Sequence, residues 1–79
     1  MMRPDLHFTE VSWRRLRKAG LPVRAVYDIV RSPERVYRRP DGITEYVGEW
    51  EGRRIVVFTD RPIEPRLVLN VVVIRGSAP

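Results

Sequence analysis

The chain has 79 residues, of which 43% are hydrophobic and 32% are charged, a composition typical of one small folded domain. It contains no cysteine, which excludes a disulfide scaffold and a metal site built on thiolates. No apolar run approaches the length of about 18 residues that a membrane span needs, and no apolar signal segment follows the charged N-terminus. We therefore expect a single cytoplasmic domain over residues 1–79 that does not bind membranes.

Positive charge is concentrated in the first half of the chain. Residues 1–39 hold ten Lys or Arg against four Asp or Glu, whereas residues 40–79 hold five against six. A regional excess of this kind favours a polyanion such as RNA, or an acidic protein surface, as the partner. Fourteen of the fifteen cations are arginine, so a codon or temperature bias explains the excess equally well.

The first half of the chain predicts a short strand followed by two helices. Residues 6–8 fit a short edge strand. Thr9 fits the N-cap of a helix over residues 10–19, which Gly20 ends in a left-handed conformation. A second helix is predicted over residues 22–31, because its apolar side chains recur on one face.

After residue 32 the apolar period changes from that of a helix to that of a strand. This change predicts antiparallel strands over residues 35–39, 43–50, 53–60 and 66–75. Two tight turns, Pro-Asp-Gly and Glu-Gly, connect the first three of them. The predicted fold is therefore α+β, with two N-terminal helices packed on one face of an antiparallel sheet of about four strands.

The two turns also fix a register, in which Tyr46 lies opposite Val57 and Glu49 lies opposite Arg54. One sheet face then carries residues assigned to the core: Val36, Tyr46, Gly48, Ile55 and Val57. Gly48 is expected to let a helix approach closely. The other face mixes charged and apolar side chains: Arg35, Tyr37, Glu45, Val47, Glu49, Arg54, Val56 and Phe58. This mixed face is either a binding surface or a solvated face with a cross-strand ion pair.

The first predicted helix has two distinct sides. At 100° per residue, Trp13 and Leu16 fall on its inner side, and both are assigned to the core. The outer side carries the candidate nucleic-acid-binding residues: Arg14, Arg15, Arg17 and Lys18. Val11 lies among these cations, and its side chain cannot transfer a proton. The stripe therefore predicts phosphate contacts, with a solvated helix face as the alternative.

Two stretches, "RLRKAGLPVRAVYDIVRSPERV" and "RRIVVFTDR", resemble the BrnT-like toxins of the RelE superfamily of ribonuclease toxins and a related family of small uncharacterised domains. The closest matches are "LRKxG" at residues 16–20 and "VVFT" at residues 56–59. The resemblance implies a RelE-like fold, RNA as the substrate and an acidic antitoxin-like protein as a partner. Members of the two families carry histidines at positions where this chain has Ala19 and Val11.

Metal-independent RNA cleavage needs a group that takes the 2′-OH proton, a group that protonates the leaving oxygen, and cations that stabilise the phosphorane. RelE-type toxins use Arg, Lys and Tyr, so the candidate catalytic residues are Tyr37, Tyr46, Arg54 and the only histidine, His7. No glycine-rich phosphate loop or metal-ligand spacing is present, and we expect neither a cofactor nor a metal. Two functions remain open: a weak or degenerate toxin-type ribonuclease, and a non-catalytic module that binds protein or RNA.

Overall fold

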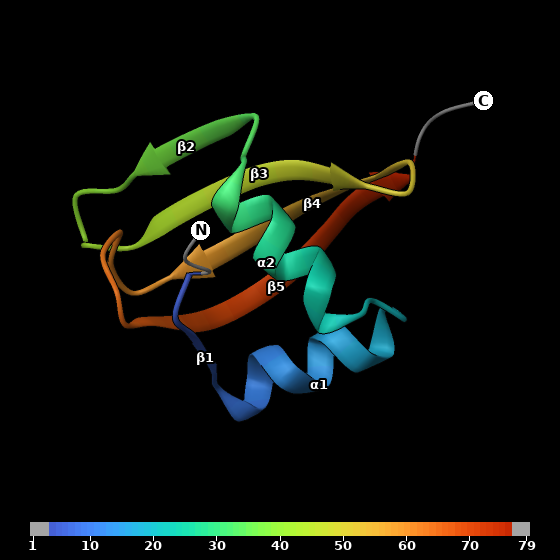
Figure 1. Cartoon of the computed structure of the whole chain (residues 1–79), viewed down its shortest axis with the longest axis horizontal. Helices are drawn as coiled ribbons and strands as arrows, with labels where there is room; N and C mark the ends of the chain where they lie inside the picture. Colours follow the sequence, from blue (N-terminus) through green and yellow to red (C-terminus); the bar gives the residue numbers. More distant parts are fainter. Residues whose placement is uncertain (1–3, 77–79) are drawn as a thin grey trace.

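The chain forms two helices and a five-stranded sheet in the computed structural model, which describes residues 4–76 (Figure 1). In chain order the elements are β1 (Leu6–Phe8), α1 (Glu10–Lys18), α2 (Val23–Arg31), β2 (Arg35–Arg38), β3 (Thr44–Trp50), β4 (Arg53–Thr59) and β5 (Arg66–Gly76). The first and last residues of each element differ from the predicted ones by at most one position. The change of period after residue 32 therefore marks the real boundary between the helices and the main part of the sheet.

The sheet is mixed, because its N-terminal strand runs in a different sense from the rest. The strand order is β1-β5-β4-β3-β2, so β1 and β2 are the two edge strands. Strands β2 to β5 pair in antiparallel fashion, whereas β1 pairs in parallel with β5. The four predicted strands are therefore antiparallel as expected, but the prediction of a purely antiparallel sheet of about four strands is wrong, because β1 adds a fifth strand that runs parallel to β5. Periodicity identified residues 6–8 as an edge strand, but it does not reveal that Leu6 pairs with Arg66 at the other end of the chain.

The register set by the two turns is confirmed. Tyr46 pairs with Val36 on one side and with Val57 on the other, as expected. Gly42 and Gly52 have φ angles of 91° and 79°, a conformation that glycine adopts without strain and other residues rarely do. These glycines allow both hairpins to reverse over few residues, and the short turns then determine the pairing.

The two helices pack on different parts of the sheet. Helix α2 lies over β3 and β4, whereas α1 lies beside β5 and β1 (Figure 1). The buried side chains of both helices join those of the sheet in one core cluster, which includes Leu16, Ile29 and Ile55. A Cβ atom at Gly48 would lie 3.1 Å from Cγ1 of Ile29. The predicted role of Gly48, a close approach of helix to sheet, is therefore confirmed.

Two residues assigned to the core are exposed at the surface. Trp13 is 43% exposed, because the inward side of α1 is occupied by Ser12 and Leu16, and Trp13 lies at its margin. Val36 is 42% exposed, because α2 lies over β3 and β4 and leaves β2 uncovered. Both assignments to the core are therefore wrong, and both side chains are available for contact with a partner.

We expect Gly48→Val to lower the free energy of unfolding by about 1–3 kcal/mol, because the added methyl groups overpack the contact with Ile29. The midpoint of urea unfolding measures the change. Valine favours strands more than glycine does, so a loss of stability would come from crowding and not from strand propensity. Ile29→Ala should then lower the free energy of unfolding less in the Gly48→Val variant than it does in the natural protein. An unchanged midpoint in Gly48→Val would show that the contact with α2 is loose.

Candidate nucleic-acid interface

The predicted basic stripe lies on the outer side of α1. Thr9 begins the helix, and its Oγ1 accepts a hydrogen bond of 3.1 Å from the backbone N–H of Ser12. Ser12 and Leu16 are buried, which fixes the inner side of the helix against the core. All four candidate cations are exposed: Arg14, Arg15, Arg17 and Lys18. The helix therefore presents its cations together, as the sequence predicts.

Both ends of α1 are tied to the sheet. At its beginning, the Thr9 N–H donates to the carbonyl of Val68 (3.1 Å), and its hydroxyl donates to the carbonyl of Leu69 (3.4 Å). At its end, Arg53 Nη1 donates to the carbonyl of Ala19 over 2.7 Å. A cation at a helix C-terminus also interacts favourably with the helix dipole. These contacts hold the basic side of α1 in one orientation.

Three of the four cations have no acidic partner among the residues that the structure describes. Arg14 Nη2 lies 2.6 Å from Oε1 of Glu10, an exposed ion pair one helical turn apart. Within residues 4–76, by contrast, the side chains of Arg15, Arg17 and Lys18 take part in no ion pair. Their charges are therefore free to attract the phosphates of a polyanion.

Trp13 lies directly beside these cations. A surface groove of about 570 Å³ is lined by Glu10, Trp13, Arg14, Arg17 and Lys18. The Trp13 ring packs edge to face on Phe8, with ring centroids 5.8 Å apart and an angle of 71° between the planes. An exposed aromatic ring among cations is the combination with which proteins hold single-stranded nucleic acids, through base stacking and phosphate contacts.

Trp13 is the functional candidate that the sequence interpretation missed. Its position at the margin of the apolar arc of α1 led to its assignment as a core residue. The sequence did contain a sign of its exposure: on the helix, Trp13 lies away from Leu16, which is at the centre of the buried side. A large aromatic residue at such a margin is able to pack with one edge and remain exposed with the other.

The four candidate catalytic residues do not share a site. His7 lies on β1 and Tyr37 on β2, at opposite edges of the sheet. Tyr46 is buried on the face that packs on the helices, whereas Tyr37 and Arg54 belong to the other face. His7 is exposed, and its Nε2 lies 3.2 Å from Oδ1 of Asp5. The structure therefore separates the proton-transfer groups that the ribonuclease interpretation would need together.

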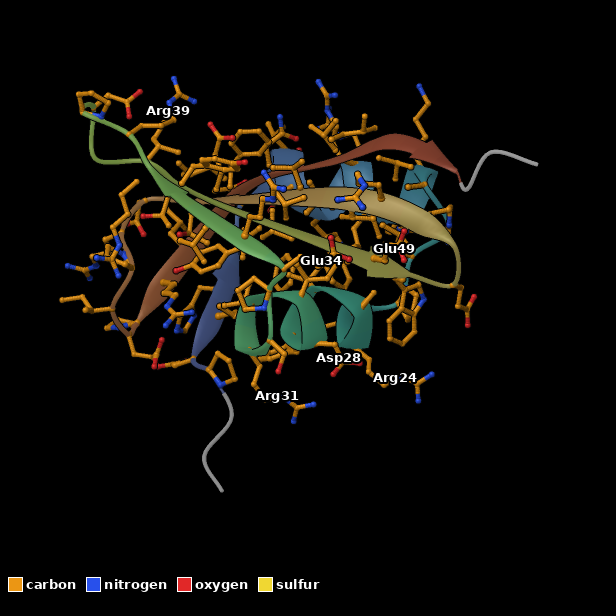
Figure 2. All side chains as sticks on the ribbon, turned by 90° about the horizontal axis from the view of Figure 1, so that it is seen from above. Arg24, Asp28, Arg31, Glu34, Arg39 and Glu49 are labelled. Carbon is orange, nitrogen blue, oxygen red and sulfur yellow. The ribbon has the colours of Figure 1, made fainter. Side chains whose placement is uncertain are left out.

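Local contacts account for Arg54 and Tyr37. Arg54 forms ion pairs with Glu34 (3.1 Å) and Glu49 (3.8 Å), two acids that Figure 2 shows on neighbouring segments beside α2. The predicted cross-strand pair between Glu49 and Arg54 is thus present. The hydroxyl of Tyr37 accepts a hydrogen bond of 3.4 Å from Arg35, which raises the pKa of that arginine. Both candidates are thus engaged with neighbours on an exposed face.

In the part of the chain between residues 4 and 76, no group of three or more His, Cys, Asp or Glu residues is placed to hold a metal ion. Neither of its helices combines the length and the apolar character needed to cross a membrane. No family model matches the chain, and no curated protein or solved structure matches it either.

We expect Arg53→Met to lower the free energy of unfolding by about 1–2 kcal/mol, because the carbonyl of Ala19 loses a charged donor. Urea unfolding measures the loss. The neighbouring change Arg54→Met is the control, since it removes only exposed ion pairs and should cost less than about 1 kcal/mol. Equal losses in the two variants would contradict an anchoring role for Arg53.

Proposed function

We propose that this protein is a RelE/BrnT-like domain that binds single-stranded RNA through α1 and has little or no ribonuclease activity. The observation that carries the proposal is the outer side of α1, where unpaired cations lie beside an exposed tryptophan on a helix fixed at both ends. The resemblance of the sequence to toxin families supports RNA as the polyanion. The net charge of +5 supports the same class of partner.

In the proposed complex, the RNA backbone follows α1. Arg15, Arg17 and Lys18 contact phosphates, because no acid competes for their charge within the described chain. Arg14 exchanges its exposed pair with Glu10 for a phosphate, which costs little because such pairs contribute only a few tenths of a kcal/mol. One base stacks on Trp13. Binding of this kind tolerates many sequences, since every base has a face on which to stack.

The second candidate function is a toxin-type ribonuclease, which the resemblance favours. General acid–base catalysis contributes about 10²- to 10⁴-fold to such reactions, and it requires the groups to converge on one phosphate. Here His7 and Tyr37 lie at opposite edges of the sheet. Val11, where related domains carry a histidine, is 50% exposed on α1. RNA binding is therefore the better supported function.

We expect the affinity for a uridine-rich single-stranded RNA to fall with salt at a log–log slope of about −3, or −0.7 for each of the four phosphate contacts, including that of Arg14. Changing Arg15, Arg17 and Lys18 to Gln should abolish most of this slope. The control makes the same change in charge at the opposite edge of the sheet: Arg35→Gln, Arg38→Gln and Arg39→Gln. Fluorescence anisotropy between 50 and about 200 mM salt measures both.

Equal slopes in the two triple variants would show that the basic side of α1 is only a solvated helix face. The RNA recovered after the titration provides a second result. It should remain full length, because the proposed complex holds RNA without cleaving it. Efficient cleavage by the natural protein would instead establish the ribonuclease alternative.

We expect Trp13→Ala to weaken RNA binding by about 1–3 kcal/mol, because one stacked base is lost. The salt slope should stay unchanged, since no phosphate contact is removed. Trp13→Phe should retain part of the affinity, because a smaller ring still stacks. The same anisotropy titration measures all three proteins, and urea unfolding corrects for the lost contact with Phe8. Equal affinity in Trp13→Ala and the natural protein would exclude stacking on Trp13.

A further inference from the structure

We propose that the outer edge of β2 binds an acidic segment of a partner protein, which adds to the sheet as an extended strand. This surface lies at the other end of the strand order from β1 and β5, against which α1 packs. It is therefore distinct from the proposed RNA-binding surface. Three features of β2 favour such a partner: its free backbone edge, the groove beside it and its charge.

Among residues 4–76, no strand pairs with the outer edge of the β2 backbone. The N–H of Arg39 donates to the carbonyl of Ile43, over 2.9 Å, at the base of the hairpin. In an antiparallel pair, alternate residues turn their backbone groups toward the partner strand. Val36 and Arg38 therefore direct their N–H and C=O groups away from β3. All four residues of β2 are exposed, so an extended segment can reach these groups and pair with them.

A groove lies beside this edge on the helix-facing side of the sheet. It has a volume of about 470 Å³, and its lining includes Pro33, Val36, Arg38, Tyr46, Pro62 and Arg66. The side chains of a strand point alternately to the two faces of a sheet. Every second side chain of a strand added to β2 would therefore face the groove. Val36, exposed on this face of β2, offers it an apolar contact.

The groove carries positive charge that is only partly compensated. The guanidinium of Arg66 lies over the ring of Tyr46, at 5.4 Å from its centroid. Its Nε is buried and lies 2.7 Å from Oε2 of Glu64, at a geometry that does not make a hydrogen bond. Arg38, on the other wall, takes part in no ion pair within the described chain. A carboxylate entering the groove would therefore meet two arginines and a single acid.

The positive charge of β2 also determines which kind of partner strand can pair with its edge. Three of the five residues from Arg35 to Arg39 are arginines, at positions 35, 38 and 39. Charged edge strands oppose pairing with a second copy of themselves, because like charges would meet across the new pair. The same charges favour a strand rich in Asp or Glu. Arg39 already pairs with Asp41 and Glu45 near the hairpin end, where Figure 2 shows it, which leaves Arg35 and Arg38 for the partner.

The test uses the full chain and a blocked peptide in which Glu alternates with Val. We expect saturable binding by calorimetry, together with slower hydrogen exchange at the amides of Val36 and Arg38 when the peptide is bound. The variant Arg38→Gln should bind it about tenfold more weakly, since one charged contact is lost. Arg17→Gln, an equal change in charge on α1, should bind it as the natural protein does.

Two further peptides separate strand addition from simple attraction of charge. A peptide with Gln in place of Glu should bind weakly, because the arginines then lose their partner. A peptide with Glu retained but with N-methylated backbone amides should also bind weakly, because it cannot pair with the edge. Equal binding of the N-methylated peptide, or unchanged exchange at Val36 and Arg38, would overturn the proposal. Protection of these two amides by single-stranded RNA, with none by the peptide, would overturn it as well.

Discussion

The parallel pairing of β1 with β5 is the contact on which the arrangement of the molecule depends. It brings the N-terminal strand to the last strand of the chain and leaves Thr9 beside Val68 and Leu69. Helix α1 begins at that point and therefore continues along β5. Without this pairing, the hairpins formed by β2, β3 and β4 would keep their register, but the beginning of α1 would lose its attachment, and the contact of Arg53 and the packing of Leu16 alone would hold the helix.

The two edges of the sheet then acquire different chemical characters. On the side of β5 and β1, a helix covers the sheet and presents cations and an aromatic ring from its outer side. On the side of β2, no further strand follows within the described part of the chain, and backbone groups, arginines and an exposed valine remain at the surface. The basic charge that the composition shows as one regional excess is therefore divided between two separate surfaces.

Most of the fold was predictable from local signals, because helices, strands and tight turns depend on residues that are close together in the sequence. Gly42 and Gly52 sit in turns that fix the pairing of three strands, and the register follows from them. The pairing of Leu6 with Arg66 could not be predicted in this way, since no local rule connects the two ends of a chain. The same limit applies to the exposure of Val36, which depends on where α2 lies across the sheet.

The candidate interface was predictable only in part. The helical period alone places Arg14, Arg15, Arg17 and Lys18 on one exposed side. Whether those cations form ion pairs depends on the acidic residues that other elements place near them, and the helical period does not predict such contacts. Trp13 shows the same difficulty, because an apolar residue at the margin of a helix face becomes buried or exposed according to the width of the surface it meets.

The hydrogen bonds from Thr9 to the backbone of β5 also bear on the order in which the protein is made. The hydroxyl of Thr9 reaches a carbonyl 60 positions later in the chain. During synthesis, residues 10–18 therefore leave the ribosome long before the strand that holds them is available. The basic helix takes its final place only when β5 has emerged, so an incomplete chain does not yet carry the finished surface.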